Sequence, residues 1–343
     1  MDKRRNLTLK LIIAFIVLMA LVTVGSFISM RRLTTNLSST SKAGTGIKYT
    51  GHYAFIHTGS DEDLWDSIYE GARIKGEELG IYVEDFGAGL TVDYDRNELI
   101  AIAAGAEVDG IIVEGDTDEE ESAAINKAIE AGIPVVTVFN DCAESSRVSF
   151  VGFSNYNIGR QYGEQLLKTI NTEEPVRISV LMDNEQASGN SNLVISGITD
   201  VFTEKGVLDG YEIEGVYVNN ESAFTAEEDI RDIFLNGDLP DVMVAMNSVY
   251  TRCLFQAVVD YNKMGDVSIY GFDDSEDILE AVSKGLIEGT VSVDPTRMGA
   301  SAVSALDEYI STGYVSDYIT QDTEVILIGD AKAKLETDVE ETE

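Results

Sequence analysis

Seven residues stand where an apolar, strand-like run of the chain gives way to a polar segment or a helix. They are Thr58, Glu114, Phe139, Asn140, Asp183, Asn247 and Asp273. In an open parallel β-sheet, ligands bind beyond the carboxyl ends of the strands, so residues at these points face a binding crevice. Their positions therefore nominate these seven as ligand-binding residues.

The same residue types do not form a recognisable catalytic set. The chain has no glycine-rich phosphate loop, no G-x-S-x-G nucleophile elbow and no H-E-x-x-H zinc motif. Carboxylate pairs such as Asp273-Asp274 arise by chance when 61 of 343 residues are acidic, so they do not indicate acid–base catalysis. His57 ends a predicted strand and has no partner nearby in sequence. We therefore expect a protein that binds without turnover and needs no cofactor.

Cysteine and histidine are too sparse to form a structural metal site. Cys142 and Cys253 are the only cysteines, and His52 and His57 are the only histidines. No zinc-type spacing joins them, so we expect no metal. In an exported protein the two cysteines allow one disulfide, which would lock the two halves of the chain together. Two separate thiols are the interpretation we favour.

The elements that must position the strand-end residues alternate regularly. A strand–helix–strand unit occurs twice, over 109–140 and 241–273, and each central helix stops at a glycine, Gly132 or Gly265. This pattern is typical of parallel strands joined by crossover helices. Further strands are predicted at 52–57, 81–86, 147–153, 176–182, 211–218, 286–293 and 324–328. Helices are predicted at 61–79, 94–106, 155–170, 190–205, 224–235, 275–284 and 296–312. The sequence thus predicts a doubly wound α/β fold with parallel central sheets.

Charge is distributed unevenly along the chain. The formal net charge is −37, yet residues 1–48 hold eight of the 24 basic residues and one of the 61 acidic ones. The remainder carries about −44 and would repel nucleic acid phosphates and anionic lipid, so neither is expected as a partner of the folded part. The acidic residues 332–343 are predicted to be a disordered tail.

Residues 11–30 form an uncharged apolar run that is long enough to cross a bilayer as a helix. Basic residues precede it, which predicts a cytoplasmic N-terminus and an exported remainder. The apolar run is longer than that of a cleaved signal peptide, so we favour a retained anchor, with cleavage and secretion as the alternative. The Ser/Thr/Gly-rich segment 31–47 is predicted to be a flexible tether. Either way, the bulk of the protein lies outside the cytoplasm.

Four segments, in order and at matching spacing, resemble the type I periplasmic binding proteins, in particular the ribose- and galactose-binding branch. They are GARIKGEELGI (71–81), DGIIVEG…AGIPVVTV (109–138), FVGFSNYNIGRQYGEQL (150–166) and VSIYGFDDSEDILEAV…G (267–285). The resemblance implies two Rossmann-like lobes joined by a three-segment hinge that closes on a ligand. Lobe one would comprise 48–153 and 294–321, and lobe two 154–293 and 322–331.

The resemblance also adds residues to the expected site. Glu62 and Trp65 fall where sugar binders of this family place an Asn and a stacking Phe. Asn247 and Asp273 match positions that hydrogen-bond sugar hydroxyls. Two alternatives are open: Trp65 packs in the core, and Asp273 caps the helix that follows it.

The chain departs from the family pattern at several of these positions. Phe139-Asn140 replaces an Asp-Arg or Asp-Asn pair, Phe153 replaces a Ser or Thr, and Glu114 replaces an Asn. Phe272 adds a fourth aromatic residue near three carboxylates. Aromatic faces and carboxylates both attract cations. The family resemblance makes a sugar or sugar derivative the expected ligand. The departures from the family pattern make an amino sugar, nucleoside-like or amine ligand the challenger.

Two functions follow from this reading of the sequence. In the first, the protein captures a solute outside the membrane for an ABC permease. In the second, it reports solute occupancy to a membrane sensor such as a histidine kinase. A repressor of related fold would need a helix-turn-helix ahead of the lobes, where residues 11–30 instead form an apolar run.

Overall fold

The computed structural model describes residues 49–57, 62–92, 94–170, 175–182, 188–219, 222–236 and 239–342. The predicted anchor at 11–30 and the predicted tether at 31–47 lie outside these residues. Within the described part, no helix combines the length and apolar character needed to span a bilayer.

The chain alternates between strand and helix from residue 51 onward. The first elements are β1 (Gly51–Ile56), α2 (Glu62–Leu79), β2 (Ile81–Asp85), α3 (Arg96–Gly105), β3 (Gly110–Glu114), α4 (Glu119–Glu130), β4 (Val135–Val138) and β5 (Ser149–Gly152). They are followed by α5 (Asn155–Thr169), β6 (Val176–Met182), α6 (Ser188–Lys205), the 3-10 turn η2 (Leu208–Gly210), β7 (Tyr211–Tyr217), α7 (Ala223–Asn236), β8 (Val242–Val244), α8 (Ser248–Asp260), β9 (Ser268–Phe272), α9 (Glu276–Ser283) and β10 (Gly289–Val293). The last elements are α10 (Pro295–Thr312), β11 (Tyr318–Thr320), β12 (Thr323–Leu327) and α11 (Ile328–Thr342).

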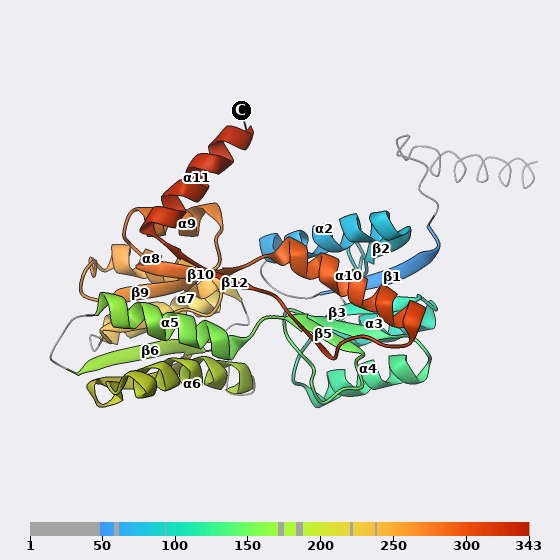
Figure 1. Cartoon of the computed structure of the whole chain (residues 1–343), viewed down its shortest axis with the longest axis horizontal. Helices are drawn as coiled ribbons and strands as arrows, with labels where there is room; N and C mark the ends of the chain where they lie inside the picture. The colour runs from blue at the N-terminus through green and yellow to red at the C-terminus, as the bar shows by residue number, and fades with distance from the viewer. Residues whose placement is uncertain are drawn as a thin grey trace, which may run out of the picture. The chain divides into compact units, whose positions relative to one another are not determined.

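The strands form two six-stranded sheets. The first has the order β11-β5-β4-β3-β1-β2 and the second β12-β10-β9-β8-β6-β7. All pairings are parallel except that of β10 with β12. We call the first sheet with its helices lobe one and the second lobe two (Figure 1). The predicted fold class of two parallel α/β lobes is confirmed.

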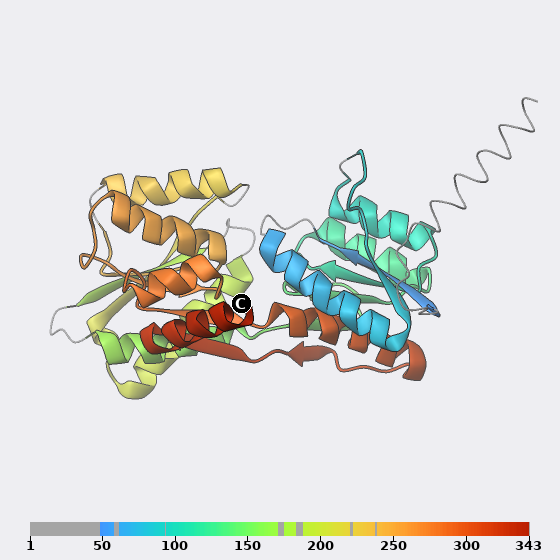
Figure 2. The same cartoon turned by 90° about the horizontal axis from the view of Figure 1, so that it is seen from above.

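The chain passes between the two sheets three times. It leaves lobe one after β5, returns after β10, and crosses again in the two residues between β11 and β12. Figure 2 shows β11 and β12 following one another from one sheet to the other. Three crossings give each lobe strands that are distant in sequence.

Both faces of the lobe-one sheet are apolar, because alternate residues of its strands point to opposite sides. Tyr53 and Phe55 of β1 pack in the cluster that holds Trp65 of α2 and Met298 of α10. Ala54 and Ile56 of the same strand pack in a second cluster, which includes Leu99 of α3 and Ile125 of α4. The sheet is therefore doubly wound, as the apolar runs predict.

Two elements differ from the sequence-based expectation. The three-residue edge strand β11 was not predicted, because it lacks an apolar run and alternates exposed and half-buried residues. The predicted disordered tail is instead the helix α11 through Thr342. Ala331 is fully buried and Leu335 packs against the core of lobe two. Packing of this apolar edge stabilises a helix that the acidic composition concealed.

Glycines allow two helix pairs to approach very closely. A Cβ on Gly299 of α10 would lie 1.8 Å from the Ile68 carbonyl oxygen of α2, and one on Gly71 would lie 1.9 Å from the Thr296 oxygen. In lobe two, a Cβ on Gly159 of α5 would lie 2.1 Å from the Val194 oxygen of α6. These contacts leave no room for a side chain.

We expect Gly299→Ala to lower the free energy of unfolding by about 1–3 kcal/mol, because the methyl group forces α2 and α10 apart. Gly105→Ala at the end of α3 is the matched control, since nothing lies within 4 Å of its added Cβ. That control should be neutral or stabilising by up to about 1 kcal/mol. Urea unfolding of both variants measures the difference, and equal stabilities would contradict the packing argument.

Candidate functional site

The strand ends place the predicted residues in two corresponding groups. In lobe one, Glu114 ends β3 and Phe139 follows β4, while in lobe two Asp273 follows β9. Glu114 pairs in register with Val138, and the Gly115 N–H donates to the Asn140 oxygen at 3.1 Å. The ends of β3 and β4 are thus held side by side. Thr58, Asp183 and the side chain of Glu62 lie outside the part of the chain that the structure describes.

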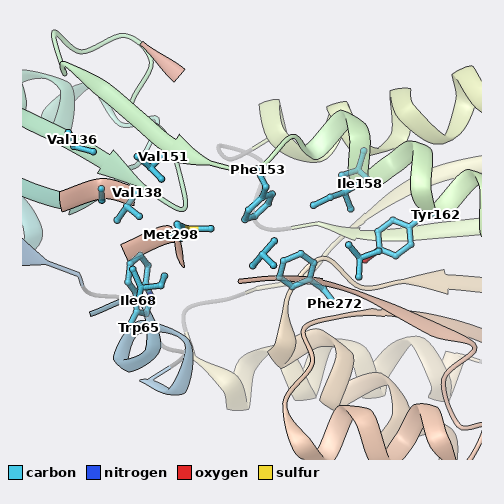
Figure 3. Packing of buried hydrophobic residues seen from close by; sticks show 14 of the residues in the cluster. Trp65, Ile68, Val136, Val138, Val151, Phe153, Ile158, Tyr162, Phe272 and Met298 are labelled. Carbon is cyan, nitrogen blue, oxygen red and sulfur yellow. The ribbon is translucent and has the colours of Figure 1, made fainter. Parts of the chain in front are cut away.

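Four predicted aromatic residues form a continuous row, which we call the aromatic row: Trp65, Phe139, Phe153 and Phe272. Successive ring centroids are 5.8, 5.3 and 5.8 Å apart. The first two contacts are edge-to-face, a favoured arrangement of aromatic rings. Phe153 lies just after β5, where the chain leaves lobe one, and Figure 3 shows it between Trp65 and Phe272. The row therefore continues from lobe one into lobe two.

Trp65 is enclosed by its neighbours. It is 2% exposed, and the ring of His57 stacks on it at 5.2 Å with an interplanar angle of 14°. In this structure Trp65 belongs to the core of lobe one, which is the packing interpretation raised from the sequence. Its contact with a ligand stays a prediction. His57, which the sequence analysis set aside, is a direct neighbour of the predicted site.

Two residues of the site adopt a left-handed backbone that side chains disfavour. Phe139 has φ +67° and Asp273 has φ +90°. Each follows the corresponding strand of its lobe, and each N–H donates to the next strand, Phe139 to the Val151 oxygen and Asp273 to the Val291 oxygen. Such conformations cost of order 1–3 kcal/mol and cluster at functional sites, where the surrounding structure imposes them. This strain could not be predicted from the residue types, because neither residue is a glycine.

Asp273 is half-buried beside the start of α9. Burial raises the pKa of its carboxyl group, and hydrogen bonds from Ser275 oppose that effect. The carboxylate accepts from the Ser275 N–H at 3.3 Å and lies 4.0 Å from Arg252 Nη2. Ser275, not Asp273, is the N-cap residue of α9. Asn247 does act as a cap, accepting from the Tyr250 N–H at 2.7 Å.

Glu114 lies in a cluster of three carboxylates around Arg96. The guanidinium is 3.0 Å from Glu114, 3.2 Å from Asp116 and 2.7 Å from Glu121. The Asp116 N–H also donates to Glu121 at 2.7 Å, which fixes the loop after β3. Arg96 therefore neutralises the negative charge of Glu114, which the sequence analysis assigned to the ligand site.

A second arginine holds the loop after β4. Arg147 is bidentate to Asp141, with Nε–Oδ1 at 2.5 Å and Nη2–Oδ2 at 2.7 Å, and its Nη1 donates to Asp317 at 2.8 Å. Thr137 donates to the same Asp141 oxygen at 2.9 Å. Because Asp317 immediately precedes β11, this network ties the strained Phe139 loop to the strand that leads into the third crossing.

Neither metal nor disulfide chemistry is present at the described residues. They contain no group of three or more His, Cys, Asp or Glu side chains arranged to hold a metal ion. Cys142 and Cys253 are both free thiols, in agreement with the interpretation favoured from the sequence. Burial raises the pKa of Cys253 to about 11, which keeps that thiol protonated at neutral pH.

Residues 53–313 match the family model described as periplasmic binding protein domain. The chain belongs to this family. The match confirms the resemblance stated from the sequence, and it also supports the expectation of a non-enzymatic protein, since members of this family bind solutes.

Curated relatives and solved structures agree with this assignment. The D-apiose import binding protein of Actinobacillus succinogenes is 22% identical over 89% of this chain and 97% of its own length. The ribose import binding protein RbsB of Escherichia coli is 23% identical over 80% and 89%. Among solved structures, the glucose-galactose binding protein GanP of Geobacillus stearothermophilus has a TM-score of 0.73 at 26% identity, covering 82% of this chain and 99% of GanP.

We expect Arg147→Met to lower the free energy of unfolding by about 3 kcal/mol, because it leaves the Asp141 carboxylate without its main partner. Arg147 is 7% exposed in its side chain. Arg160→Met is the matched control, since its bidentate partner Glu204 is 57% exposed and the pair is solvated. Thermal and urea unfolding compare the two, and an equal loss in both variants would contradict a structural role for the Asp141 network.

Glu121→Gln should change the pH dependence of stability. Burial raises the pKa of Glu121 from 4.5 to about 7, against the opposing effect of Arg96. Between those values the folded protein retains a proton that the unfolded chain has lost, so stability falls as pH rises through this window. Glutamine removes the titration, and the variant should gain about 1–3 kcal/mol relative to wild type between pH 5 and pH 8. Urea unfolding at both pH values tests this, and a pH-independent difference would refute it.

Proposed function

We propose that this protein is an extracytoplasmic solute-binding protein that clamps a small sugar or sugar derivative between its two lobes for ABC-type uptake. The observation that carries the proposal is family membership over 53–313 together with full-length relatives that are sugar import binding proteins. The site residues of both lobes support it, because the strand ends of each lobe offer polar groups beside the aromatic row.

The ligand class follows from the charge balance of the site. Two of the three carboxylates that suggested a cationic ligand have arginine neighbours: Glu114 with Arg96 at 3.0 Å, and Asp273 with Arg252 at 4.0 Å. A carboxylate with a cationic partner attracts an amine less strongly and still accepts hydrogen bonds from hydroxyls. A neutral sugar therefore fits better than an amino sugar, nucleoside-like or amine ligand.

Closure of the lobes would use the three crossings as hinges. Lobe one of the proposal comprises 48–153 and 294–321, and lobe two comprises 154–293 and 322–331. Domain closure of this kind places the bending in a few residues at the ends of elements. Phe153, directly after β5, would then pack differently in the open and closed forms.

The N-terminal segment completes the proposal. Residues 11–30 would anchor the protein in the cell membrane and 31–47 would tether the lobes at its extracytoplasmic face. A membrane position keeps a solute-binding protein near a permease or a sensor.

A second candidate function is ligand sensing together with a membrane receptor. It is favoured by similarity to a chain of the XylFII-LytSN complex, with a TM-score of 0.68 and 25% identity over 82% of this chain and 98% of that one. Loss of labelled-sugar uptake on deletion of the protein would indicate import. Retained uptake with a lost transcriptional response to the sugar would indicate sensing.

Isothermal titration with D-apiose, D-ribose, D-fructose, D-arabinose, D-glucose and D-galactose tests the proposed function. We expect Asp273→Asn to weaken the tightest of these by about tenfold or more, the usual effect of losing a hydrogen bond to a charged group. Asparagine tolerates the left-handed backbone at this position, so the loop should keep its conformation. Glu114→Gln should bind within about threefold of wild type, because Glu114 already has Arg96 as its partner.

Asp232→Asn, on the exposed face of α7, is the control that should bind unchanged. Failure of wild type to bind any of these sugars would overturn the proposal. Binding of an amine that Glu114→Gln abolishes would instead establish the challenger.

A further inference from the structure

The C-terminal helix α11 contacts the ligand-binding loop of lobe two through one lysine. Lys334 Nζ lies 2.9 Å from Asp274 Oδ2 and 2.9 Å from Glu324 Oε2. Asp274 directly follows Asp273, and Glu324 lies in β12, the strand that follows the third crossing between the sheets. One ammonium group therefore joins the loop after β9 to the strand at the hinge.

The loop is held from its other side by α8. Arg252 Nε lies 2.8 Å from Asp277 Oδ2, and its Nη2 donates to the Ser275 hydroxyl at 3.0 Å. Asp273, with its strained φ of +90°, directly precedes these attachment points in the chain. A strained conformation persists only where the surroundings impose it. Strand β10 holds the Asp273 backbone through Val291 and Thr290, and Lys334 and Arg252 are cations that contact the loop beyond it.

Lys334 and its partner Asp274 form an ion pair that is only partly exposed to solvent. The side chain of Lys334 is 32% exposed and that of Asp274 is 30% exposed, so both are partly withdrawn from water. Without the ammonium group, Asp274 and Glu324 would lie near one another with no cation between them, and Asp273 would add a further negative charge beside Asp274. Like charges in a partly buried setting repel and would displace the loop.

We propose that Lys334 is a positioning residue that sets the conformation of the Asp273 loop and couples it to the hinge strand β12. Lys334 acts through Asp274 and Glu324 and does not touch the ligand. α11 is then part of the binding apparatus, as a brace on the loop that carries the best-supported ligand carboxylate. The effect on sugar affinity rests on the proposed function, while the effect on the loop does not.

Lys334→Met tests the proposal against Lys332→Met, the same substitution two residues earlier at an exposed position of α11. Hydrogen exchange on the ligand-free full-length protein is the first measurement. We expect faster exchange of the amides of Asp273, Ser275 and Leu279, whose N–H groups donate hydrogen bonds in this loop, in Lys334→Met alone, with global unfolding close to wild type. Lys334→Arg should restore protection, because it retains the charge. The proposal is overturned if these amides exchange at the wild-type rate in Lys334→Met, or if their exchange rate rises equally in Lys332→Met.

Titration with the tightest-binding of the six sugars named above is the second measurement. We expect Lys334→Met to bind about two- to fivefold more weakly, the range for loss of a partly exposed ion pair. The difference should shrink in 1 M salt, where screening acts over about 3 Å. The double variant Lys334→Met with Asp274→Asn should lose less binding free energy than the sum of the losses in the two single variants, because both substitutions remove the same contact. Unchanged affinity in Lys334→Met contradicts the coupling, whereas absence of sugar binding by wild type contradicts the proposed function and leaves the exchange result to decide the loop.

Discussion

The packing of Phe153 between Phe139 and Phe272 joins the two sheets at the point where the candidate site lies. The ring centroids are 5.3 and 5.8 Å apart, and the three residues come from the loop after β4, the first crossing and the end of β9. Aromatic rings keep close contact over a range of angles, so such a junction tolerates rotation of one lobe against the other.

Around that junction, ion pairs hold the loops in place. Arg147 fixes the loop after β4, Arg96 fixes the loop after β3, and Lys334 with Arg252 braces the loop after β9. In a chain with 61 acidic and 24 basic residues, each of these cations serves two or three carboxylates. Four of the cations thus contact the loops of the candidate site. That arrangement explains how a strongly acidic protein maintains two strained residues, Phe139 and Asp273, at corresponding strand ends.

The sequence was sufficient for the fold, because apolar runs buried on both faces leave little freedom in how strands and helices alternate. It failed at β11 and α11, where short or acidic segments owe their structure to neighbours. Ala331 and Leu335 pack α11 against the core of lobe two. Two apolar residues are too weak a periodic pattern to predict a helix in a segment, 330–343, that holds six acidic residues. At the candidate site, the strand-end rule nominated the loops after β3, β4 and β9. It could not reveal the partners of their carboxylates, since Arg96 reaches Glu114 from 18 positions away.

The sequence by itself determined the α/β class and the family, and it located the strand ends that carry the candidate residues, since each follows from periodicity and local motifs. Tertiary structure alone decided which carboxylates have cationic partners, which aromatic rings meet, and that Trp65 is stacked on His57. Pairing and stacking depend on distances between elements that are remote in the chain, and no local pattern encodes those distances. The left-handed backbone of Asp273 was decided in the same way, by the hydrogen bond to β10 and the attachments to α8 and α11.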